Sequence, residues 1–160
     1  MAGEKSTAID AGGISRGGTA VIRVMAVRAA AIVALVQGIA HAAMFAAAKP
    51  GSIEEAIVLT TMKGSHFVIG GMRRSYWDLY YGYGMIAAGT VIFEAILLWL
   101  LANAAAKSEA AVRPILWLMV AANVAHAAAL LWFFFPLPAV FDALVALALV
   151  AALVGRRARG

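Results

Sequence analysis

PILWLMVAANVAHAAALLWFFF, residues 114–135, is the stretch that decides the fold of this chain. It contains no Asp, Glu, Lys or Arg, and a helix of about 20 apolar residues is long enough to cross the hydrocarbon core of a bilayer. Three further windows are as apolar or nearly so, and they also lack lysine and arginine: residues 29–48, 84–106 and 138–154. Together the four windows predict four transmembrane helices.

Composition supports a membrane protein and excludes several other classes. Of the 160 residues, 64% are hydrophobic and only 13% are charged, which is too few charges to cover a soluble domain of this size. The chain has no cysteine, so disulfides, thiolate ligands and CxxC redox chemistry are excluded. The net charge of +5 does not indicate a nucleic-acid partner, because the basic residues stand at helix borders and do not form one face.

The distribution of Lys and Arg predicts the orientation in the membrane. With a cytoplasmic N-terminus and four helices, nine basic residues lie on the cytoplasmic side and four on the outer side. Cytoplasmic loops are enriched in Lys and Arg, so we predict a multi-pass protein with both termini cytoplasmic. The nine are Lys5, Arg16, Arg23, Arg28, Lys107, Arg113, Arg156, Arg157 and Arg159, and the four are Lys49, Lys63, Arg73 and Arg74.

The predicted fold is an all-α integral membrane protein, an up-down four-helix transmembrane bundle with a short outer interfacial helix. Residues 1–20 are rich in Gly, Ser and Ala and are expected to be a mobile cytoplasmic tail, and residues 156–160 form a basic cytoplasmic tail. One transmembrane domain covers residues 21–155. Its helices are expected at about 22–48, 79–106, 113–135 and 137–155, with the interfacial helix at about 52–63.

The outer segment carries its own helix signal. Ser52-x-x-Glu55 is a capping-box pattern, the residues that follow are amphipathic, and Gly64 ends the pattern. Gly70 and Gly71 lie a few residues further on. We expect a helix on the outer membrane surface, followed by a flexible hinge, with residues 52–71 covering the mouth of the bundle.

Two helical hairpins share short sequence patterns, which predicts a duplicated helical hairpin. Residues 37–43 (QGIAHAA) resemble residues 123–128 (NVAHAA) around a histidine. Residues 91–97 (VIFEAIL) resemble residues 139–145 (AVFDALV) around an acidic residue that follows Phe. Parallel repeats of this kind occur in membrane transport proteins.

The two histidines and two acids of these patterns are predicted to form one buried layer. Each lies 13 or 14 residues from a basic residue at the cytoplasmic border, or roughly 20 Å along a helix. Ionisable side chains at membrane depth normally face the protein interior and have partners, so we expect all four to converge on one site. The four residues are His41, Glu94, His126 and Asp142.

Acid–base chemistry is the leading hypothesis for this layer. A His–carboxylate pair can hold a proton near neutral pH, which suits an isomerase-like enzyme, or a binding protein, for an apolar small molecule that enters from the bilayer. The four layer residues would be catalytic. The candidates for substrate binding are Gln37, Asn123, Trp99, Trp132, Asp78 and His66.

Three alternatives stay open at this stage. The four layer residues form an acceptable nitrogen and oxygen ligand set for Zn, Fe or Mn. His41 and His126 could instead be the axial ligands of haem b. In the third alternative the layer only fixes packing in a non-enzymatic structural or accessory subunit. The small size and long Ala-rich faces also make a homo-oligomer plausible.

The helix count and the buried His and carboxylate residues resemble the emopamil-binding and sigma-2-like family of four-helix membrane proteins. The resemblance implies a four-helix membrane fold and a sterol-like apolar ligand. No motif of that family matches this chain position by position, so the resemblance assigns no residue a role.

Overall fold

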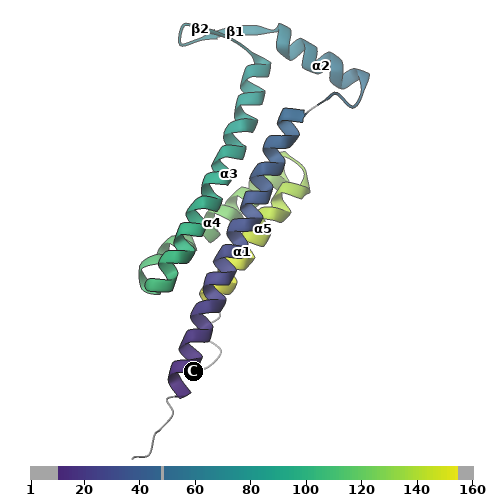
Figure 1. The fold of residues 1–160 in the computed structure, drawn as a ribbon. Helices are drawn as coiled ribbons and strands as arrows, with labels where there is room; N and C mark the ends of the chain where they lie inside the picture. The colour runs from purple at the N-terminus through teal and green to yellow at the C-terminus, as the bar shows by residue number, and fades with distance from the viewer. Residues whose placement is uncertain (1–10, 48, 155–160) are drawn as a thin grey trace, which may run out of the picture. The chain divides into compact units, whose positions relative to one another are not determined.

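The computed structural model of the chain describes residues 11–47 and 49–154, and most of these residues are helical (Figure 1). Helices and strands follow one another in the order α1 (Ala11–Ala47), α2 (Ile53–Gly64), β1 (His66–Ile69), β2 (Met72–Ser75), α3 (Tyr76–Lys107), α4 (Glu109–Phe133) and α5 (Pro136–Val154).

The chain divides into two compact units. Among the described residues, the terminal unit combines residues 11–30 with residues 98–154, and the middle unit comprises residues 31–47 and 49–97. The division passes through α1 and α3, so both helices contribute to both units. The terminal unit also contains α4 and α5, and the middle unit contains α2 and the two strands.

Four of the helices are long and apolar enough to cross a membrane. They cover Ala20–Ala47, Tyr76–Lys107, Glu109–Phe133 and Pro136–Val154. The shortest has 19 residues, about 28 Å at the rise of an α-helix, which approaches the thickness of the hydrocarbon core. These helices indicate a multi-pass membrane protein. The up-down bundle and the duplication stay predictions.

α1 begins well before its predicted start. The sequence predicts a tail up to residue 20, but the helix extends back to Ala11, and this corrects the prediction for residues 11–20. Residues 1–10 and the predicted basic tail 156–160 lie outside the described residues. Extending an existing helix by one residue orders only that residue and gains one hydrogen bond, whereas starting a new helix orders several residues for its first bond. The proline-free stretch before Ala20 can therefore continue α1 despite its glycines.

A β-hairpin stands where the sequence predicts only a hinge. β1 and β2 pair antiparallel, with Ile69 opposite Met72. Gly70 and Gly71 form the turn at φ values of 57° and 77°, and glycine reaches such positive angles without steric cost. The glycines thus close a tight hairpin turn, and the hinge prediction is corrected to this extent.

Reciprocal capping bonds start α3 three residues before its predicted start at 79. The Ser75 N–H donates to Asp78 Oδ2 at 2.8 Å, and the Asp78 N–H donates to Ser75 Oγ at 3.1 Å. This is a capping box, in which two helix-terminal N–H groups gain side-chain partners. Because β2 ends at Ser75, the hairpin runs into α3 without a linker.

Close approach of α1 and α3 holds the middle unit together. A Cβ atom built on Gly38 would lie 2.7 Å from Ile92 Cγ1 and 3.2 Å from the Ala88 carbonyl oxygen, and one on Gly84 would overlap the Phe45 ring. A larger residue at Gly38 would press on Ile92 and on backbone atoms of α3, and one at Gly84 would displace the Phe45 ring. Small residues let transmembrane helices pack backbone to backbone in this way.

Polar contacts join the helices of the terminal unit. Arg23 Nη1 lies 2.9 Å from Glu109 Oε2, and the Arg23 side chain is only 9% exposed. Arg28 donates to Asn103 Oδ1 at 3.1 Å and lies over the Trp99 ring at 5.1 Å. These contacts connect the first part of α1 to the end of α3 and the start of α4.

α4 and α5 pack against each other through buried stripes with helical spacing. Each stripe is apolar apart from one residue, Asn123 on α4 and Asp142 on α5. The buried residues of α4 are Val112, Leu116, Val120 and Asn123, and those of α5 are Ala139, Asp142, Val145, Ala146, Leu149, Ala152 and Leu153.

Candidate functional site

The terminal unit brings His126 and Asp142 into direct contact. His126 Nδ1 on α4 lies 2.9 Å from Asp142 Oδ2 on α5, which is an ion-pair distance when the imidazole is protonated. The Asp142 side chain is 4% exposed, whereas the His126 side chain is 54% exposed. The carboxylate is therefore buried in the helix interface, and the imidazole projects from it.

The buried carboxylate of Asp142 influences which nitrogen of the His126 ring carries a proton. A carboxylate only accepts hydrogen bonds, so the carboxylate of Asp142 favours a proton on Nδ1, the ring nitrogen that faces it. In neutral imidazole the lone pair is then on Nε2. A carboxylate bonded to Nδ1 also stabilises the imidazolium that forms when Nε2 takes up a proton, as in serine hydrolases. The pair can therefore act as an oriented general base.

Asn123 lies almost one turn before His126 on α4. Its side chain is buried, and Nδ2 donates to the Met119 carbonyl oxygen at 3.0 Å. This bond to the preceding turn of the same helix satisfies one of the amide donors. The role of Asn123 in substrate binding, predicted from the sequence, stays a prediction.

The middle unit places His41 in different surroundings. The His41 ring lies 5.0 Å from the Phe45 ring, one turn further along α1, with the planes tilted by 49°. Gln37, one turn earlier, is buried, and Glu94 on α3 is half-buried. The contact of His41 with Phe45 is a ring contact, whereas His126 contacts a carboxylate.

Phe45 belongs to an aromatic cluster that the sequence analysis missed. Its ring lies 5.3 Å from Tyr80 and 6.5 Å from Tyr81, and both tyrosines contact Trp77 at 5.7 and 5.8 Å. The Lys63 ammonium lies 4.8 Å from the Trp77 ring centre. The four-residue spacing from His41 to Phe45, which puts both on one helix face, was the available signal.

Asp78 and His66, both predicted to bind substrate, have local partners. Asp78 caps α3 through Ser75. His66 Nδ1 lies 2.8 Å from the Gly64 carbonyl oxygen, and the residue is exposed. Each contact stabilises a turn or a helix end, which is a sufficient structural reason for the residue.

The role of the two candidate tryptophans in substrate binding stays a prediction. Trp99 forms the cation–π contact with Arg28. Trp132 is 82% exposed on α4, a position that suits contact with lipid at the membrane border. The placement of both rings thus has an explanation without a substrate.

Within residues 11–47 and 49–154, no group of three or more His, Cys, Asp or Glu side chains is arranged to hold a metal ion. The convergence of all four layer residues on one site, predicted from the sequence, stays a prediction. The pair that the structure brings together is His126 and Asp142.

Comparison with known proteins gave no matching family model, curated protein or solved structure. The function has therefore to be inferred from the chemistry of the chain's own residues.

Proposed function

We propose that this chain is a small membrane-embedded enzyme of the isomerase type, or a binding protein, for an apolar small molecule, and that His126 and Asp142 form its acid–base pair. The observation that carries this proposal is the 2.9 Å contact between a buried carboxylate and a half-exposed imidazole. An ionisable pair at membrane depth is costly to insert, and such residues usually have a functional role.

The proposed reaction needs only the residues of the pair. His126 Nε2 takes a proton from a C–H group of the substrate, and Asp142 stabilises the imidazolium that results. The imidazolium then returns the proton to another carbon of the same molecule, so a double bond shifts. No atom is gained or lost, and no oxidant or reductant takes part.

Exposure of His126 supports a substrate that arrives from the lipid. The imidazole is on the helix surface, and Ala122, Ala129 and Phe133, which share its face of α4 at helical spacing, are apolar and exposed. An apolar molecule dissolved in the bilayer could approach this face without crossing water. That His41 and Glu94 take part in the same reaction stays a prediction from the sequence.

Proton exchange with solvent tests the proposal with an unidentified substrate. The protein, reconstituted in D₂O buffer, is incubated with an apolar lipid extract of the membranes in which it is made, and lipid masses are recorded. We expect deuterium in at least one lipid, because the abstracted proton exchanges with water before it returns. His126→Gln should lower the incorporation by about 10²–10⁴-fold, the range for loss of a general base.

Matched variants separate catalysis from structure. Asp142→Asn preserves the shape of the side chain but no longer fixes the tautomer of His126, so it should also lower incorporation while the protein stays folded. Thr90→Ala is a control in α3, away from the pair. It removes a hydroxyl that donates to the Ile86 carbonyl oxygen of the same helix, and it should leave incorporation unchanged. Absence of deuterium with the unmodified protein would reject catalysis. If the variants lose thermal stability but keep deuterium incorporation, the pair only stabilises the packing of α4 against α5.

The alternatives of metal and haem have direct readouts on the same preparation. A Soret band would identify haem, and stoichiometric metal would identify a metal site. Either finding would replace the acid–base proposal, because His126 would then be a ligand and not a base.

We propose further that both termini are cytoplasmic and that residues 50–75, with α2 and the hairpin, are on the outer side. The nine-to-four distribution of Lys and Arg supports this orientation. Epitope tags at residues 1 and 160 should be protected from protease outside intact cells, whereas a tag inserted between Pro50 and Gly51, in the exposed loop before α2, should be cleaved. An externally accessible terminus would reverse the assignment.

A further inference from the structure

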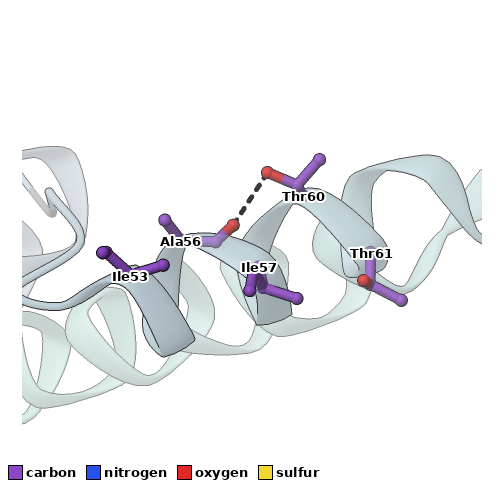
Figure 2. A pocket seen from close by; sticks show the side chains of 5 residues that line it. All are labelled: Ile53, Ala56, Ile57, Thr60 and Thr61. Atoms are coloured by element: carbon purple, nitrogen blue, oxygen red, sulfur yellow. Dashed lines mark hydrogen bonds between the residues drawn. The ribbon is translucent and has the colours of Figure 1, made fainter.

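An exposed apolar stripe runs along α2. Ile53, Ala56, Ile57, Thr60 and Thr61 line a shallow depression on one face of this helix (Figure 2). The Thr60 hydroxyl donates to the Ala56 carbonyl oxygen at 2.7 Å, so it needs no partner from water. Ile53 is 77% exposed and Ile57 62% exposed, and none of the residues of α2 is buried. An apolar helix face of this kind suits the membrane interface.

The hairpin presents a second apolar surface beside basic residues. Val68, Ile69 and Met72, around the glycine turn, are all more than half exposed. Arg73 and Arg74 follow directly and are also exposed. Residues 63–75 contain no Asp or Glu, so the charge of this end is positive and complements an anionic surface.

The acidic residues of the segment are at its other end. Glu54 and Glu55 are in the first turn of α2. Glu55 Oε2 accepts from the Gly51 N–H at 2.6 Å. Hydrogen bonds from its own backbone N–H and from Ser52 lower the pKa of Glu54. Both carboxylates thus serve the N-terminal end of the helix. Asp78, the acid that follows the hairpin, caps α3 and attracts Arg74, and the three basic residues Lys63, Arg73 and Arg74 outnumber it.

Chain connections keep this surface at the membrane boundary. Residues 48–52, at most about 18 Å when extended, join α2 to the membrane-spanning part of α1, and β2 continues directly into α3. The Tyr76 N–H donates to the Ser65 carbonyl oxygen at 3.2 Å, and the Phe67 and Tyr76 rings are 5.2 Å apart. The hairpin is thus fixed to the first turn of a transmembrane helix.

We infer that α2 and the hairpin form a binding surface for the anionic phospholipid headgroups of the surrounding leaflet. The Ile53–Ile57 stripe and the Ile69–Met72 turn enter the boundary between headgroups and acyl chains. Arg73 and Arg74 bind the phosphates, to which guanidinium groups can donate two parallel hydrogen bonds. This inference does not depend on the acid–base proposal.

The absence of cysteine from the sequence makes the test direct. An environment-sensitive fluorophore is attached to the full chain through Ile57→Cys, Ile69→Cys or, outside the stripe, Glu54→Cys. Each protein is reconstituted in vesicles of phosphatidylcholine alone or mixed with phosphatidylglycerol. In the mixed vesicles we expect lipid-borne quenchers to reach the labels at positions 57 and 69, and water-soluble quenchers to reach the label at position 54.

Removal of charge tests the role of the arginines. Arg73→Gln and Arg74→Gln should each lower the ratio of lipid-inserted to water-exposed label at position 69 by roughly fivefold in the anionic vesicles, from about 1 kcal/mol per basic residue near such a surface. Neither variant should have an effect in phosphatidylcholine alone. Lys107→Gln, at the opposite end of α3, should have no effect in either case.

Three outcomes would overturn the inference. Labels at positions 57 and 69 that only water-soluble quenchers reach would show that the surface faces water. Equal insertion in both kinds of vesicle would exclude recognition of anionic headgroups. Labels reached by neither quencher would show that protein, such as a second copy of the chain, covers the surface.

Discussion

The two units of this protein hold their helices together by different forces. In the terminal unit, polar side chains from separate helices meet: Arg23 with Glu109, and His126 with Asp142. In the middle unit, α1 and α3 approach so closely at Gly38 that a Cβ atom there would press on Ile92 and on the Ala88 carbonyl oxygen, and aromatic rings fill the space towards the hairpin. Lipid offers no hydrophobic drive for helix association, so both hydrogen bonds and close packing can serve this purpose.

The two histidines show that similar sequence patterns can have different chemical surroundings. His41 and His126 lie in nearly identical short patterns. Yet His126 contacts a buried carboxylate, whereas the ring contact of His41 is with Phe45. Equal spacing sets the depth of a side chain along its helix, but the neighbouring helix determines which group it meets.

The ion pair of the terminal unit should give the largest effect. Glu109→Gln removes the partner of a guanidinium that stays buried, and breaking a buried pair in this way costs about 3 kcal/mol. We expect a loss of this size in chemical unfolding followed by circular dichroism in detergent micelles. Lys107→Gln, two residues earlier and exposed, should change stability little. Equal small effects would mean that apolar packing alone holds this unit.

Overpacking should reveal the close approach in the middle unit. Gly38→Val places methyl groups against Ile92 and the Ala88 backbone, and we expect a cost of about 2 kcal/mol, which is typical of forced extra volume. Gly89→Val is the matched control on α3, because a Cβ there meets nothing within 4 Å. If both variants unfold at the same denaturant concentration, the helices are not in the close contact described.

Replacement by Leu should lower the stability of the protein at His126 but not at His41. His126→Leu removes the polar contact with a buried carboxylate and should cost about 1 kcal/mol, near the upper values measured between membrane helices. His41→Leu replaces a polar ring beside Phe45 by an apolar side chain and should leave stability equal or raised. Thermal unfolding of both variants in the same detergent provides the measurement.

A double variant controls the histidine prediction. Adding Asp142→Leu to His126→Leu removes both polar partners, so it should recover most of the lost stability. An equal loss from His41→Leu would show that His41 has a polar partner of comparable strength, and the two units would then be chemically alike.

The smallest effect should be a loosening of α2 in acid. The pKa of Glu54 is lowered by hydrogen bonds from its own N–H and from Ser52. Because the folded pKa is below the unfolded value, this contribution is fully present above about pH 4.3, the usual range for Glu, and is lost as the pH falls through the lowered pKa. Amide exchange in α2 should accelerate over this interval.

Glu54→Gln controls the acid effect. This variant cannot titrate, so its amide exchange in α2 should lack the acid-dependent step. The same step in the variant would assign the effect to another group, of which Glu55 is the nearest along the chain.

Several elements could be predicted from the sequence because they depend on local physics. An apolar run of some 20 residues must form its own backbone hydrogen bonds in lipid, and four such runs therefore became four helices. The Ser52-x-x-Glu55 pattern also marked the start of α2, where the Glu55 N–H donates to Ser52 Oγ at 3.1 Å. The second half of this capping box differs, since Glu55 accepts from Gly51 and not from Ser52.

Other local features are present in the sequence but allow more than one interpretation. Gly70-Gly71 suits a hinge, yet two glycines between short apolar segments also favour a hairpin turn. Ser75-x-x-Asp78 is a capping-box pattern of the same kind as the one at Ser52, and it explains why α3 starts at Tyr76.

For the candidate site, the sequence by itself determined which residue types lie at which depth: two histidines and two acids, each 13 or 14 residues from a basic border residue. Only the tertiary structure decided that Asp142 of α5 meets His126 of α4, and that Phe45 of α1 meets Tyr80 and Tyr81 of α3. Helical periodicity fixes rise and face along one helix. It does not fix the rotation of that helix against its neighbour, which depends on how all contacting side chains pack.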